Sequence, residues 1–82
     1  GSFFFADIQN NQVDAVGLNI LRLIAAEGEE AIVSKNIILQ QLTDVSESAW
    51  QQLLQRDLIE EVGGGYRFQV ELIRRWFAVR NR

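Results

Sequence analysis

Three arginines near the C-terminal end are the side chains best suited to bind a charged group. Arg67, Arg74 and Arg75 belong to a stretch that has five arginines from residue 62 onward against a single acid, Glu71. A guanidinium can hold a phosphate or a carboxylate through two parallel hydrogen bonds. Because Arg74 and Arg75 are adjacent on a predicted helix, they should point about 100° apart and should not face one ligand together. Three uses are open: solvated surface with one Glu71–Arg75 pair, a contact to a neighbouring domain, or binding of nucleic-acid phosphate.

A second candidate surface is the polar side of a helix predicted over residues 47–56. Its outward residues include Ser48, Gln51, Gln52 and Gln55. Glutamine can read adenine in the major groove of DNA. The charged residues in and around this helix are Asp44, Glu47 and Asp57, with Arg56 as the only cation. Because carboxylates near phosphate lower the affinity for DNA, we predict that this face meets solvent or a protein.

The composition excludes most catalytic classes. The chain of 82 residues (9.4 kDa) is 48% hydrophobic and 23% charged, has a formal charge of −3, and contains no cysteine or histidine. It therefore has no disulfide, no thiolate or imidazole metal ligand, and no histidine to shuttle protons. Glu60 and Glu61 fall on opposite faces of a predicted strand, so they do not converge as an acid/base couple. We predict a non-enzymatic domain that holds no cofactor or metal of its own.

The chain is short enough for one domain. Gly1 and Ser2 look like the remnant of a cleaved expression tag, which leaves residues 3–82 as a single domain. No apolar run approaches the roughly 18 to 20 residues of a membrane span, and no signal peptide with a basic start is present. We predict a cytoplasmic location without a membrane partner.

Apolar spacing and capping residues predict three helices in the first two thirds of the chain. Apolar residues from Val13 to Ile24 recur at steps of three and four, which indicates a helix over residues 12–27 with one buried face. Gly28 suits the left-handed end of that helix. Ser34 and Ser46 suit N-caps for helices over residues 35–42 and 47–56. The first of these should bury Ile38 and Leu42 with Ile37 or Leu39 beside them, and the second should bury Ala49, Trp50, Leu53 and Leu54.

After residue 57 the spacing of apolar residues changes from helical to alternating. Residues 58–62 and 66–69 have the pattern of two strands, joined by a turn of three glycines at residues 63–65. Alternation places Tyr66 and Phe68 on the inner face, and Arg67 and Gln69 on the outer one. Ile32 and Val33 could supply a small third strand, and helical spacing returns over residues 70–79.

The aromatic residues form two groups, and each group has two possible interpretations. Phe3, Phe4 and Phe5 fit either the end of a preceding helix that packs back on the core or an exposed apolar patch for a neighbouring domain, and both can hold. The other large aromatic residues fit a core better than a stacking platform for single-stranded nucleic acid. The periodicity of the predicted helices and strands places these side chains on inward faces: Trp50, Phe68, Trp76 and Phe77.

The order of elements predicts a mainly α fold with a small β-hairpin. Helix, short helix, helix, hairpin and helix is the order of a winged helix: a three-helix helix-turn-helix core, a wing, and a C-terminal helix. The alternative is a purely helical bundle in which the glycine turn is only a loop.

Two stretches resemble a known family. Residues 49–61 (AWQQLLQRDLIEE) and 64–77 (GGYRFQVELIRRWF) are similar to the C-terminal winged-helix domain that follows the nucleotide-binding core in prokaryotic AAA+ and STAND-type NTPases. Phe3 to Phe5 match the aromatic entry to the first helix of that domain. The resemblance implies a regulatory module that contacts the adjacent NTPase domain or another protein, with Arg67, Arg74, Arg75, Phe3 and Phe4 as candidate contacts.

The resemblance also places nucleotide chemistry outside this chain. It implies that ATP and the Walker motifs belong to the NTPase core, and the three glycines here are followed by Tyr66 and Arg67, without the Lys and Ser/Thr of a P-loop. Some branches sense the nucleotide phosphate through a histidine in this domain, a residue that the chain lacks. The alternative function is a DNA-binding winged-helix transcription regulator that uses the helix over residues 47–56 for recognition.

Overall fold

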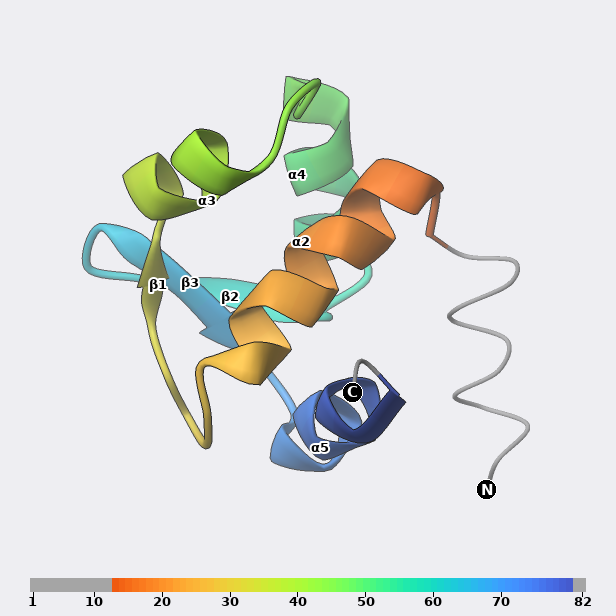
Figure 1. The fold of residues 1–82 in the computed structure, drawn as a ribbon, viewed down its shortest axis with the longest axis vertical. Coiled ribbons are helices and arrows are strands. Elements are labelled where there is room, and N and C mark those ends of the chain that lie inside the picture. The colour runs from red at the N-terminus through yellow and green to blue at the C-terminus, as the bar shows by residue number, and fades with distance from the viewer. Residues whose placement is uncertain (1–12, 81–82) are drawn as a thin grey trace.

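The computed structural model describes residues 13–80, whose helices and strands form a mixed α/β fold. In chain order the elements are α2 (Ala15–Ala26), β1 (Val33–Ser34), α3 (Lys35–Gln41), α4 (Glu47–Gln55), β2 (Ile59–Val62), β3 (Gly65–Phe68) and α5 (Glu71–Arg80). The strands make one antiparallel sheet in the order β1-β3-β2. Figure 1 shows α2 at the centre, with α3 and α4 on one side of it and α5 on the other.

Helix α2 begins later than the apolar pattern predicts. Asp14 caps it, because its side chain accepts a hydrogen bond from the backbone N–H of Gly17 at 2.9 Å. The helix therefore begins at Ala15 instead of residue 12. Its buried face includes Ile20 and Ile24, as predicted, and the chain leaves it through Gly28 at a φ of 114°.

Both predicted serine caps are confirmed. The hydroxyl of Ser34 accepts the N–H of Ile37 at 3.2 Å, and that of Ser46 accepts the N–H of Ala49 at 3.3 Å. Helix α4 buries Ala49, Trp50 and Leu53 as predicted, whereas Leu54 is half-buried at the edge of the core.

The burial predicted for helix α3 is confirmed for Ile38, partly confirmed for Leu42 and wrong for Ile37 and Leu39. Only Ile38 is fully buried; Leu42 is half-buried just beyond the helix, and Ile37 and Leu39 are 45% and 44% exposed. A helix of seven residues touches the core along one line, and the neighbours of Ile38 are turned about 100° to either side of that line.

The sheet contains the predicted hairpin with a shorter turn. Only Gly63 and Gly64 lie between β2 and β3, and Gly63 has a φ of 60°. Gly65 belongs to β3, where it lies opposite Ser34 of β1. The third strand contains Val33 but not Ile32, which precedes it. Tyr66 and Phe68 are buried, as predicted.

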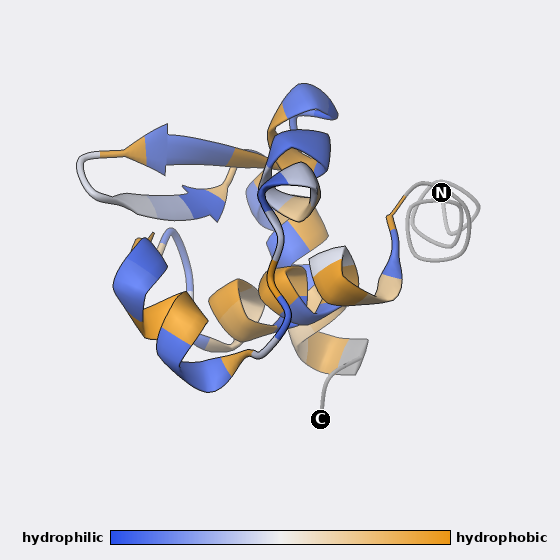
Figure 2. Cartoon of the chain, turned by 90° about the horizontal axis from the view of Figure 1, so that it is seen from above, coloured by the Kyte–Doolittle hydropathy of each residue, from blue (hydrophilic) through white to orange (hydrophobic). Residues whose placement is uncertain are grey.

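Aromatic packing joins the helices to the sheet. Trp50 of α4 stacks on Tyr66 of β3 with ring centroids 4.7 Å apart, and Phe77 of α5 contacts Phe68 at 5.8 Å. Trp76 is half-buried and meets Phe77 edge-on at 5.0 Å. These rings are mainly core, as predicted, and Figure 2 shows hydrophobic residues concentrated where the helices meet.

Helix α5 runs over residues 71–80, one residue later than predicted, and packs along α2. Its buried residues Ile73 and Phe77 face the core. Within residues 13–80, no helix has the length and apolar character needed to cross a bilayer.

Candidate functional site

The polar side of α4 is one of the two surfaces that the sequence singles out. Ser48, Gln51 and Gln55 are exposed, but Gln52 is half-buried and does not share their full exposure. Two of these side chains bond to their own helix: Ser48 to the Ser46 hydroxyl at 2.9 Å, and Nε2 of Gln51 to Oε2 of Glu47 at 3.4 Å. The face is therefore polar and internally hydrogen-bonded.

The charge near this face comes mainly from carboxylates. Glu47 pairs with Lys35 at 3.7 Å, and the Lys35 ammonium also lies 5.5 Å from the ring centroid of Trp50. Asp44 and Asp57 are exposed at the two ends of α4. A phosphate approaching α4 would meet these carboxylates together with the cations Lys35 and Arg56, and the poor fit of α4 to DNA stays a prediction.

Arg67 is paired across the hairpin. It lies directly opposite Glu60 in the antiparallel register, and its Nε donates to Oε2 of Glu60 at 2.6 Å. Opposite charges at such a position stabilise the hairpin and cancel each other locally. Arg67 is thus held by the β2–β3 hairpin and is not an unpaired cation.

Arg74 is nearly buried, so the solvated surface, one of the three uses left open, does not fit this residue. Only 12% of its side chain is exposed, and its Nη1 donates to the backbone carbonyl of Ala25 at 2.9 Å. Ala25 lies in the last turn of α2, where carbonyl groups lack partners within the helix and the helix dipole favours a cation. Arg74 therefore joins the start of α5 to the end of α2.

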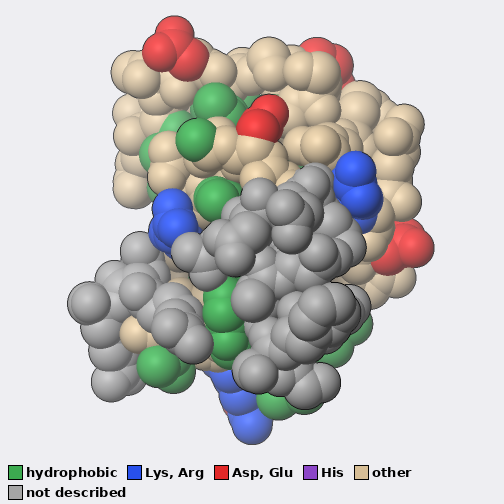
Figure 3. Space-filling model, turned by 90° about the vertical axis from the view of Figure 1, so that its right-hand side faces the viewer, with side chains coloured by type: hydrophobic (Ala, Val, Ile, Leu, Met, Phe, Trp, Pro, Cys, Tyr) green, Lys and Arg blue, Asp and Glu red, His purple; other side chains and the backbone are tan. Residues whose placement is uncertain are grey.

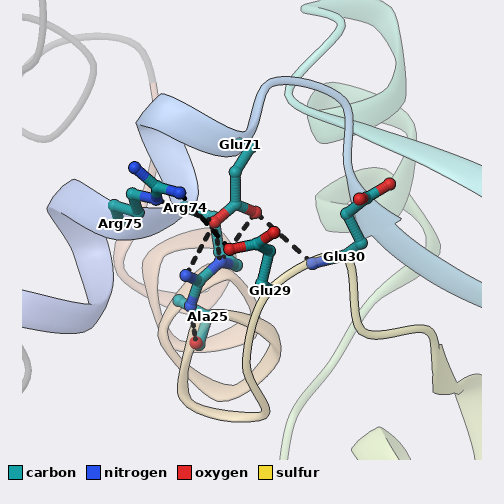
Figure 4. Close-up of polar contacts among 6 residues, drawn as sticks. All are labelled: Ala25, Glu29, Glu30, Glu71, Arg74 and Arg75. Carbon is teal, nitrogen blue, oxygen red and sulfur yellow. Dashed lines mark hydrogen bonds and ion pairs between the residues drawn. The ribbon is translucent and has the colours of Figure 1, made fainter.

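Glu71 is the centre of this cluster, and Figure 4 shows its contacts. Both its oxygens accept from Arg74, at 2.7 to 2.9 Å, and Oε2 also accepts Nε of Arg75 at 3.2 Å. Oε1 accepts the backbone N–H of Glu30 at 3.4 Å, and Arg75 reaches Glu29 at 3.3 Å. We refer to Ala25, Glu29, Glu30, Glu71, Arg74 and Arg75 as the Glu71 cluster.

Arg74 and Arg75 are adjacent on the helix, yet both reach Glu71 of the same helix. Positions three and four residues after Glu71 both lie on its side of the helix, and two long side chains can bend back to it. The predicted Glu71–Arg75 pair is present, and the spacing of three between Glu71 and Arg74 is the signal in the sequence that indicates the second pair.

The cluster keeps Glu71 ionised. Hydrogen bonding from Arg74 is the largest cause, opposed by partial desolvation and assisted by the Glu30 N–H and Arg75; together they lower the pKa of Glu71 from its ordinary 4.5 to about 2. Since the folded pKa lies below the unfolded one, the stabilisation is complete above pH 4.5 and is lost as the pH falls toward 2.

We expect Glu71→Gln to flatten the acid side of the stability profile. The melting temperature of the unchanged chain should fall more steeply between pH 5 and pH 2 than that of the variant, as followed by circular dichroism. Glu61→Gln is the matched control, because Glu61 is exposed on the neighbouring hairpin. Equal slopes for Glu71→Gln and the unchanged chain would contradict the cluster's contribution.

A small hollow lies beside the cluster. Its volume is about 100 Å³, and its lining residues are Glu30, Glu60, Arg67, Phe68, Gln69 and Glu71. Within residues 13–80, no group of three or more acidic side chains is arranged to hold a metal ion. Of the charged groups that line the hollow, Glu60 and Arg67 pair with each other, and Glu71 pairs with Arg74 outside it.

Phe3 and Phe4, the remaining candidate contacts, lie outside the described residues. The comparisons with known proteins add no relative: no family model, no curated protein and no solved structure matches the chain. The fold and the Glu71 cluster therefore carry the functional argument by themselves.

Proposed function

We propose that the chain is a non-catalytic winged-helix module that makes interdomain or protein–protein contacts within a larger NTPase of the AAA+ or STAND type. The order of elements supports the winged-helix part, with α2, α3 and α4 as the helical core and the β2–β3 hairpin as the wing. The strand order β1-β3-β2 also fits, because a short strand before α3 pairs with the returning strand of the wing. The NTPase part rests on the resemblance of residues 49–61 and 64–77.

The observation that carries an interaction role is the internal pairing of the arginines. Arg67 is paired with Glu60, Arg74 with Glu71 and the α2 terminus, and Arg75 with Glu29 and Glu71. Nucleic-acid affinity depends largely on basic side chains that can neutralise phosphates. Pairing within the protein removes much of that capacity and favours a protein partner.

Two contacts between elements support motion of the domain as a unit. Arg74 holds α5 to the end of α2, and the Trp50–Tyr66 stack holds α4 to the sheet. In the proposed mechanism, ATP binds and is hydrolysed in the NTPase core, and this module docks or undocks as a rigid body. None of its own residues takes part in the chemistry.

A DNA titration tests this function against a transcription regulator. The anisotropy of a labelled duplex should show no saturable binding by the chain at low or physiological salt, up to about 100 μM protein. The variant Gln51→Lys/Gln55→Lys is the positive control, because two cations on the exposed side of α4 should produce salt-dependent binding. Tight binding by the unchanged chain that weakens steeply with salt would favour the regulator.

The encoding reading frame tests the NTPase part. Upstream of Phe3 we expect Walker A and Walker B motifs, and removal of this domain should change nucleotide turnover or assembly of the full protein. A reading frame that lacks both motifs would refute the NTPase assignment. The interaction role would then be tested by the DNA titration alone.

A further inference from the structure

We draw no further inference here: the strongest candidate, the exposed apolar side of α5 with Leu72 and Val79, lies at the end of the molecule where Figure 3 shows hydrophobic side chains at the surface, but nothing in the structure shows what covers it.

Discussion

Replacing Trp50 with alanine should lower the free energy of unfolding by about 3–5 kcal/mol. Trp50 is 2% exposed, and its ring stacks on Tyr66 with an interplanar angle of 25°. Only Ala49, Trp50 and Leu53 of α4 are fully buried, and Trp50 is the largest of these side chains. Urea denaturation followed by circular dichroism measures the loss.

The expected loss is a large part of the stability of a small domain, which is typically about 5–15 kcal/mol. Trp50→Phe is the graded control, since it keeps an aromatic ring at the same place and should cost less than alanine. Leu72→Ala should change stability by no more than about 0.5 kcal/mol, because Leu72 is 63% exposed. If Trp50→Ala were as mild as Leu72→Ala, the packing of α4 described above would be wrong.

This prediction also bears on the proposed function. A module that moves as a rigid body needs α4 to follow the sheet, and the Trp50–Tyr66 stack is the aromatic contact that joins them. Trp50→Ala should therefore weaken any partner contact that involves both α4 and the β2–β3 hairpin, even though Trp50 itself is not on the surface. Surface variants such as Gln51→Lys act on the contact without disturbing this link.

The features that sequence could predict depend on neighbouring residues. Ser34 and Ser46 cap their helices through a hydroxyl that reaches a backbone N–H three residues away. The hairpin follows from alternation around glycine, and its register places Tyr66 and Phe68 inward. Each of these depends on chemistry within a few residues, so a single sequence contains the required information.

The arginines show where such prediction ends. Their number and spacing identify a candidate site, but Arg74 also donates to a backbone carbonyl 49 residues earlier in the chain. Backbone carbonyls look alike in a sequence, and only the packing of α5 on α2 selects Ala25. The same limit explains α3, whose exposed Ile37 and Leu39 have the composition of core residues but find no core on their side.

The three arginines are therefore held largely by contacts within the chain. Glu71 pairs with both Arg74 and Arg75, and Glu60 pairs with Arg67, which leaves Arg75 as the most exposed of the three.

Replacing Gly65 with alanine should cost about 1–3 kcal/mol and loosen β1 from the sheet. A Cβ atom on Gly65 would lie 2.8 Å from the carbonyl oxygen of Val33 and 2.7 Å from Cγ2 of Ile32. The Ile32 side chain can turn away, but the Val33 carbonyl is backbone, so β1 itself must move. Because Ser34 of β1 caps α3, the start of that helix should be disturbed as well.

Gly64 provides the matched control for this second prediction. It is the adjacent residue, no atom lies within 4 Å of the place where its Cβ would be, and its φ is outside the left-handed range. Gly64→Ala should therefore be neutral or should stabilise by up to about 1 kcal/mol, by reducing the freedom of the unfolded chain. Thermal unfolding compares the two variants, and amide hydrogen exchange in β1 and β3 shows where protection is lost. Close approach of the strands, and not turn flexibility, requires glycine at residue 65. Equal effects of the two substitutions would contradict this conclusion and would indicate that Gly65 belongs to the turn.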